Sequence, residues 1–136
     1  MIQGKEIRIG NYLKDRGGKV LRVDFIEYVE NGFDTKFGQK MFVEGQEFHP
    51  LTEYTDYAQP IELTPEWAKR LGFEIVSGGI SYDKDRLSLY FGDTILSEKK
   101  GRTYFNSWAI LEHTPKHVHE LQNLYYALTG DELSAL

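Results

Sequence analysis

Residues 20–37, VLRVDFIEYVENGFDTKF, hold the clearest structural pattern in the sequence. Apolar and polar side chains alternate along its first part, as in a strand with one buried face, although Glu27 interrupts the apolar face. Asn31-Gly32 follows, the pair that best tolerates the positive φ angles of a type I′ turn. The stretch predicts a long strand, a tight turn and a return strand over residues 33–37, which would resume at residues 41–43.

The segments on either side of this hairpin extend the prediction to a small barrel. Upstream, residues 7–13 read as a short strand interrupted at Gly10, and residues 15–18 turn the chain into the long strand. A short strand, a glycine turn and a long bent hairpin are typical of an SH3-like barrel, an analogy of fold that carries no function. Residues 45–60 are polar and contain two prolines, so we expect them to form a connection that wraps the barrel.

The next element is a short helix with clear start and stop residues. Thr64 is the predicted N-cap, and Pro65 occupies the first helical position, where its missing N–H costs no hydrogen bond. Gly72 fits the left-handed residue that ends a helix, with Phe73 packing back against it. These residues predict about two helical turns.

Strands and one longer helix complete the chain. Residues 73–76, 80–82, 87–91 and 103–110 predict an antiparallel meander. Thr114-Pro115 repeats the cap-and-proline start and opens a helix that ends near Gly130. An apolar stripe at helical spacing should pack this helix on the sheet. The fold class is therefore α+β: an SH3-like N-terminal sheet, a short capped helix, an antiparallel meander and a C-terminal amphipathic helix.

The bulk properties indicate one small domain. A length of 136 residues is usual for a single domain, which we assign to residues 1–136, with a β-rich part (1–60) and a helix–sheet–helix part (61–136). A net charge of −5 argues against a nucleic-acid partner, which usually meets a basic surface. The chain has no cysteine, no signal-peptide pattern and no apolar run long enough for a membrane span. We expect a cytoplasmic protein.

Motifs of known chemistry do not support an enzyme. The sequence has no nucleophile elbow, phosphate loop or dinucleotide fingerprint. His113, His117 and His119 lie close together, but the last two were expected to point in nearly opposite directions on the second helix. We expect no cofactor and no metal, with the histidines facing solvent or capping the helix.

Two segments are candidates for a binding surface, although barrel closure explains the first and a solvated helix face explains the second. In Arg8-Ile9-Gly10-Asn11-Tyr12, the Gly-Asn pair would place a bulge in a strand, and Arg8 and Tyr12 are its candidate binding residues. The second is the predicted outer face of the C-terminal helix. Its hydrogen-bonding groups and aromatic ring have a composition that interfaces favour, and they come from His119, Gln122, Asn123 and Tyr126.

These two segments also carry a resemblance. Residues 8–12 (RIGNY) and 119–130 (HELQNLYYALTG) resemble a family of small proteins found in gut-type bacteria of the Bacteroides group and in their phages and mobile elements. Residues 60–64 and 71–73 are similar to the middle of that family. The resemblance implies a cytoplasmic setting and an accessory phage or mobile-element role. No activity is established for that family, so no functional residues are carried over.

The leading hypothesis is a non-catalytic binding module with a protein partner or with itself. The alternative is a protein that binds or sequesters a nucleotide-like small molecule, with aromatic rings for the base and Arg8, Lys99 or Arg102 for the phosphate. A hydrolase that uses His113 or His117 ranks third. Nucleic-acid binding by the SH3-like part ranks last.

Overall fold

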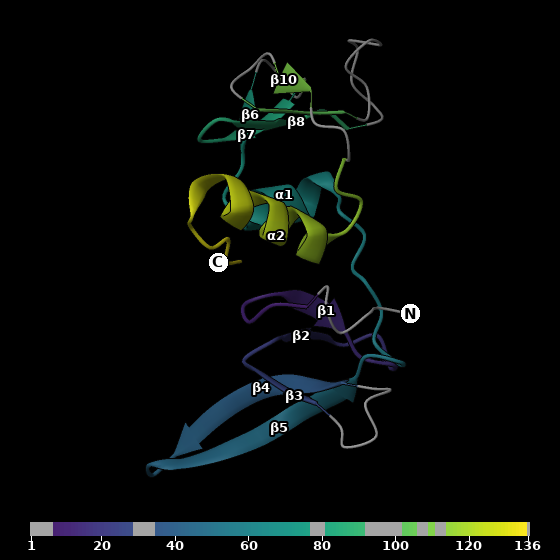
Figure 1. Cartoon of the computed structure of the whole chain (residues 1–136), viewed down its shortest axis with the longest axis vertical. Helices are drawn as coiled ribbons and strands as arrows, with labels where there is room; N and C mark the ends of the chain where they lie inside the picture. Colours follow the sequence, from purple (N-terminus) through teal and green to yellow (C-terminus); the bar gives the residue numbers. More distant parts are fainter. Residues whose placement is uncertain are drawn as a thin grey trace. The chain divides into compact units, whose positions relative to one another are not determined.

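The computed structural model describes residues 7–28, 35–76, 81–91, 102–105, 109–110 and 114–135 (Figure 1). These residues form two helices and antiparallel sheets, which confirms the α+β class. The chain divides into two compact units: unit 1 holds Met1–Ile61 and His117–Asn123, and unit 2 holds Glu62–Lys116 and Leu124–Leu136. Helix α2 (Val118–Thr129) contributes residues to both. The assignment of one domain stays a prediction.

Unit 1 contains two small sheets. The two-stranded sheet pairs β1 with β2, and the three-stranded sheet has the order β3-β4-β5. The strands are β1 (Tyr12–Lys14), β2 (Val20–Arg22), β3 (Phe25–Tyr28), β4 (Thr35–Val43) and β5 (Gln46–Tyr54). Among the described residues these sheets do not close into a barrel. The predicted Asn31-Gly32 turn lies outside the described residues.

The prediction of one long strand over residues 20–30 was wrong, because the chain changes partners in its middle. The Val23 N–H donates to the Asn11 carbonyl at 2.8 Å, on the side of the first sheet. The next N–H, of Asp24, donates to the Gly38 carbonyl at 2.7 Å, in the second sheet. Each half therefore satisfies its backbone with a different neighbour.

The prediction of an irregular connection over residues 45–60 was also wrong for its first half. Residues 46–54 form β5, which pairs with β4 through a two-residue turn at Glu44-Gly45. Both turn residues have positive φ, 51° and 81°, as a type I′ turn requires. Pro50 lies beside the register shift between Gln39 and Met41. A proline at such an irregularity lacks an N–H where the ladder is already interrupted.

Apolar side chains from both sheets meet in the core of unit 1. Leu13 and Leu21 face each other across β1 and β2, and Phe37 of β4 is fully buried. Ile26 and Leu51 pack against this core at its edge. The buried members are Ile7, Leu13, Leu21, Val23, Phe37 and Ala58.

Unit 2 begins with the predicted short helix, α1 (Pro65–Arg70). The Thr64 hydroxyl accepts from the Trp67 N–H at 3.3 Å, and Gly72 adopts a φ of 95° just beyond the last turn. The Phe73 N–H returns to the Ala68 carbonyl at 3.0 Å. Both the N-cap and the glycine stop are confirmed.

The antiparallel meander is confirmed, with shifted strand ends. Its strands follow chain order in one sheet: β6 (Glu74–Val76), β7 (Ser81–Lys84), β8 (Leu87–Leu89), β9 (Thr103–Phe105) and β10 (Ala109–Ile110). The predicted single strand over residues 103–110 is two strands that pair with each other. Helix α2 begins at Val118 rather than at Pro115, because the Lys116 carbonyl is held by the Leu63 N–H at 2.9 Å. Among the described residues, no helix is long and apolar enough to cross a membrane.

Gly38 tests the packing of the central strand of unit 1. It pairs with Phe25 on one side and with Thr52 on the other. A Cβ at this position would lie 2.2 Å from the Leu51 carbonyl oxygen, so Gly38→Ala must move a backbone. We expect the free energy of unfolding in urea to fall by about 1–3 kcal/mol. Gly17→Ala is the control, since its Cβ would come no closer than 3.4 Å to Asp15; equal losses in the two variants would contradict the explanation.

Candidate functional site

The segment before β1 and the start of α2 meet in a polar cluster inside unit 1. Both segments are predicted from the sequence as separate binding candidates, and the structure brings four of their six candidate residues together. Arg8 and Tyr12 come from the first segment, and Gln122 and Asn123 come from the helix. Asn11 joins them and is fully buried. We call these five residues the polar cluster.

The side-chain amide of Gln122 bonds the backbone of residues 10–12 as a neighbouring strand would. Its Oε1 accepts from the Tyr12 N–H at 2.9 Å, and its Nε2 donates to the Gly10 carbonyl at 2.7 Å. The side chain has no exposed surface. One amide thus satisfies a backbone donor and a backbone acceptor that lie two residues apart. Without these hydrogen bonds, burying the two groups would cost free energy.

Asn11 and Asn123 complete the cluster through their amides. The Asn123 Oδ1 accepts from Asn11 Nδ2 at 2.9 Å and from Arg8 Nη1 at 3.1 Å. Asn11 also closes a local turn, because its Oδ1 accepts from the Arg8 N–H at 2.8 Å. Gly10 adopts a φ of 99° in that turn, a backbone conformation open mainly to glycine. The Gly10-Asn11 pair therefore makes a tight turn before β1, rather than the bulge within a strand that we predicted.

The prediction of an outward-facing binding row on α2 was wrong for two of its four residues. His119 and Gln122 are buried, at 4% and 0% exposure, and the Gln122 side chain is bonded to the segment that leads into β1. Asn123 is half-buried within the polar cluster. Tyr126 is the most exposed of the four, at 44%. The assignment of these residues to a binding site stays untested.

The hydrogen bonds of the polar cluster join two segments of the fold. The contacting side chains of the cluster are three amides and one guanidinium; the Gln122 and Asn11 amides satisfy backbone groups, and Asn123 joins Asn11 to Arg8. Asn123 engages the Arg8 guanidinium, the group proposed for phosphate binding. Lys99 lies outside the described residues. The cluster is best explained as the joint that fixes residues 8–12 against α2.

The histidines were expected at the surface or at the helix cap. His117 precedes the helix and its ring stacks on that of His119, with 5.9 Å between centroids, so the prediction that the two point apart was wrong. His117 Nδ1 contacts the Glu120 carboxylate at a half-exposed position. His113 lies outside the described residues. The described part of the chain contains no group of three potential metal ligands among its His, Asp and Glu side chains.

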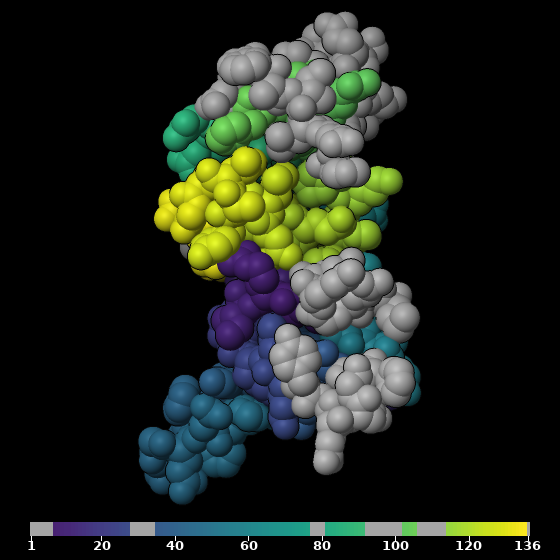
Figure 2. Space-filling view, in the orientation of Figure 1, coloured from purple at the N-terminus to yellow at the C-terminus, as the bar shows by residue number. Residues whose placement is uncertain are grey.

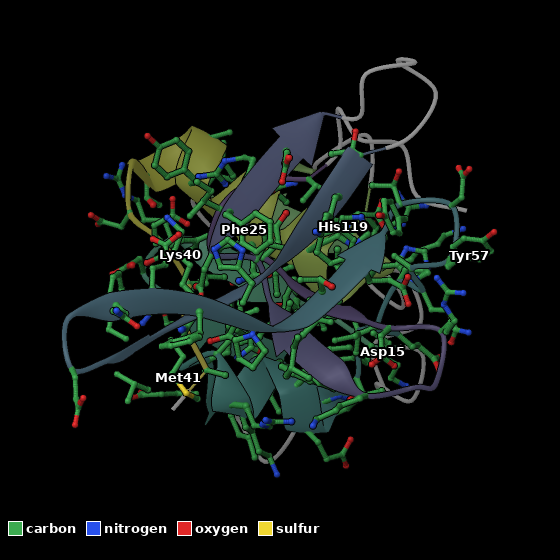
Figure 3. The ribbon with its side chains drawn as sticks, turned by 90° about the horizontal axis from the view of Figure 1, so that it is seen from below. Asp15, Phe25, Lys40, Met41, Tyr57 and His119 are labelled. Atoms are coloured by element: carbon green, nitrogen blue, oxygen red, sulfur yellow. The ribbon has the colours of Figure 1, made fainter. Side chains whose placement is uncertain are left out.

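Among the described carboxylates of unit 1, Glu53 has the pKa that is lowered most. Arg16 donates to its Oε2 from Nε at 3.2 Å and from its backbone N–H at 2.9 Å, and to its Oε1 from Nη2 at 2.9 Å. The guanidinium also stacks over the ring of Tyr57 at 3.9 Å; Tyr57 is labelled in Figure 3. The Arg16 side chain first, and then the Arg16 and Tyr54 backbone N–H groups, lower the pKa of Glu53 to about 2. A carboxylate with that pKa stays ionised at neutral pH and is unsuited to donate a proton.

In unit 2 the buried Tyr125 pairs with the exposed Asp85. The Tyr125 hydroxyl donates to the Asp85 carboxylate, and Asp85 has a φ of 53° in the turn between β7 and β8. Burial and then the Asp85 carboxylate raise the pKa of Tyr125 to about 12. The phenol therefore remains a donor at neutral pH and holds a turn residue in an unfavourable backbone conformation.

The surface that sequence analysis missed is the outer half of the β4–β5 hairpin. All residues from 40 to 49 are exposed, and the hairpin extends beyond the other strands of unit 1 (Figures 1 and 2). Four large apolar residues lie there: Met41 (52% exposed), Phe42 (66%), Val43 (50%) and Phe48 (47%). The apolar run 41–43 was the available indication, but it was assigned only as the end of a return strand.

Comparisons with known proteins do not assign the chain to a family. No protein-family model matches the sequence, and neither the curated proteins nor the solved structures give a match.

Gln122→Met tests whether the polar cluster is structural. Methionine has a similar size, but it leaves the Tyr12 N–H and the Gly10 carbonyl without the partners seen here. We expect the free energy of unfolding to fall by about 2–4 kcal/mol, since each buried unpaired backbone group costs about 1–3 kcal/mol. Tyr126→Ala is the comparison on the same helix and should change stability by about 0.5 kcal/mol or less. A Gln122→Met variant as stable as the wild type would show that the amide does not hold the segment.

The low pKa of Glu53 predicts a specific acid sensitivity. The folded pKa of about 2 lies below the ordinary value of 4.5, so ionised Glu53 stabilises the fold above pH 4.5. That stability is lost as the pH falls from 4.5 towards 2. We expect Glu53→Gln to lower stability at pH 7 and to flatten the dependence between pH 5 and pH 2.5, measured by urea unfolding. A variant with the same steep acid transition as the wild type would place the sensitivity elsewhere.

Proposed function

We propose that this protein is a non-catalytic binding module that associates with protein through the outer half of the β4–β5 hairpin. The observation that carries the proposal is the exposed apolar surface of Met41, Phe42, Val43 and Phe48. Scattered apolar residues are normal on a protein surface, whereas contiguous apolar patches mark interaction sites. Here four of them occupy a single two-stranded ribbon.

The register of the hairpin gathers three of these side chains on one face. Met41 pairs with Phe48, and Val43 pairs with Gln46, with Phe42 and Glu47 between them on the opposite face. Directly opposed residues of an antiparallel pair point to the same side. Met41, Val43 and Phe48 therefore form a contiguous patch, and the Met41 side chain points away from the ribbon in Figure 3.

The same face of β4 forms the core of unit 1 further along the strand. Residues 35, 37, 39, 41 and 43 alternate onto one side; Thr35 and Phe37 are buried there, while Met41 and Val43 are exposed. The apolar pattern thus continues past the point where the unit covers it. A partner that covers the outer half of the hairpin would bury the apolar side chains of β4 that unit 1 leaves exposed.

A cytoplasmic setting and an accessory phage or mobile-element role accompany this proposal; the role comes from the sequence resemblance, and the setting comes from the resemblance and from the composition of the chain. The likeness of the N-terminal sheets to an SH3-like fold is proposed on their strand order and glycine turns. Neither adds a reaction to the binding function.

The proposal predicts a complex that depends on the hairpin. Native mass spectrometry of protein taken directly from its expression host should show the chain bound to protein, whether another copy or a different chain. Met41→Ser with Phe48→Ser should remove that complex while leaving the melting temperature within about 3 °C, since exposed side chains contribute little to stability.

The control replaces two exposed apolar residues of unit 2, Ile75→Ser with Val76→Ser on β6. The complex should survive this change. A wild-type chain that is monomeric under all conditions would contradict the proposed function, and so would a complex that the hairpin variant retains.

A further inference from the structure

The outer strand of the hairpin offers an open hydrogen-bonding edge. In its sheet, β5 has β4 as its neighbour on one side, and the described residues place no strand on the other. The Val43–Gln46 pair closes a two-residue turn, so it exchanges both backbone hydrogen bonds, and the next pair does not. The N–H and C=O of Glu47 consequently point outward, towards any strand added at this edge.

The usable part of this edge is short and well defined. Pro50 and the register shift beside it interrupt the strand on the inner side, and further in, Glu53 is held by Arg16. The turn at Glu44-Gly45 ends it on the outer side. What remains is centred on Glu47-Phe48-His49, whose residues are all exposed.

From this edge we propose that the protein which binds the hairpin is a second copy of this chain, paired antiparallel through β5 about a two-fold axis at Phe48. This inference rests on the proposed function and names its partner. In this register Phe48 faces Phe48 of the second copy, and Glu47 faces His49 on both sides of the axis. The result is a continuous four-stranded sheet made of both hairpins.

Charge complementarity selects the second copy as partner and also selects the register. Glu47 and His49 flank Phe48 symmetrically, and they already attract each other within one chain, at 2.8 Å between Oε2 and Nε2. The two-fold pairing repeats that carboxylate–imidazole contact between the copies twice. Moving the axis by one residue to Glu47 would place two carboxylates opposite each other, which is unfavourable for like charges. Moving it to His49 would place two imidazoles opposite each other, so that neither faces a carboxylate.

The symmetry also joins the apolar patches. A two-fold axis perpendicular to the sheet keeps each face on its own side, so the patches of Met41, Val43 and Phe48 from both copies merge. A row of Met41, Phe48, Phe48 and Met41 would cross the four strands on one face. The ten exposed residues of each hairpin are fewer than the 20–30 per side of a standard interface, so we expect dissociation constants at the micromolar level or weaker.

The test uses the absence of cysteine from the chain, which makes single-cysteine variants unambiguous. Phe48→Cys should give a disulfide-linked dimer on mild oxidation, because directly opposed residues have Cβ atoms about 4.5–5.5 Å apart. Phe42→Cys is the matched control: it is at least as exposed, but it lies on β4, away from the pairing edge. It should remain monomeric under the same oxidation.

Sedimentation velocity of the unmodified chain from about 5 µM to about 500 µM should show a monomer–dimer equilibrium. Glu47→Lys should weaken it at least about tenfold, as expected for removing the carboxylate that faces His49 on both sides of the axis. Cross-linking of Phe42→Cys as fast as Phe48→Cys would overturn the register. A purified chain that is monomeric at every concentration would overturn the inference; if native mass spectra then show a hairpin-dependent complex with a different protein, the proposed function still stands, and if they show none, both fail.

Discussion

The side-chain amide of Gln122 satisfies two backbone groups of a segment more than a hundred residues away in the sequence, and the arrangement of unit 1 depends on that contact. Burial removes water as an alternative partner, so the Gly10 carbonyl and the Tyr12 N–H need protein partners. A glutamine offers a donor and an acceptor on one short plane, which suits two groups that are two residues apart along an extended chain. Once Tyr12 is held, β1 begins at that residue and pairs with β2.

The same contact explains why the two segments singled out in the sequence have their unusual composition. Residues 8–12 combine a turn glycine with a buried asparagine, and the start of α2 presents two adjacent amides. Each segment looks like a binding surface when considered alone, because the same kinds of polar side chain serve to bind a partner and to stabilise a fold. Here the partner is the other segment, and its distance in the sequence hides the pairing from any local pattern.

Local sequence patterns correctly predicted the elements whose ends are decided by interactions within a few residues. The short helix α1 starts and ends as its threonine, proline and glycine require, because capping is decided within a few residues. The meander strands were found with shifted ends. The strand β5 was missed because Pro50 and charged residues argue against a strand, and only its pairing with β4 across a bulge shows how they are accommodated. The division of residues 20–30 was equally invisible, since it depends on which neighbours, Asn11 and Gly38, lie nearby.

The hairpin combines features that prevent strand pairing with one short stretch that permits it. Open edges are a hazard that proteins limit with proline, bulges and charge, and all three occur here: Pro50, the shift beside Lys40, and the Lys40–Glu47 pair at 3.6 Å. Pro50 and the register shift limit pairing at the inner part of β5, where it would compete with the core, whereas Glu47 belongs to the outer part. The outer part keeps its backbone groups and a contiguous apolar face, and a carboxylate and an imidazole, those of Glu47 and His49, flank Phe48. If strand pairing were blocked along the whole edge, the hairpin would stay unpaired. If the whole edge were open to pairing, the chain would tend to aggregate. An edge that is blocked except for a short, self-complementary stretch instead favours pairing of two copies over a limited length and in one register.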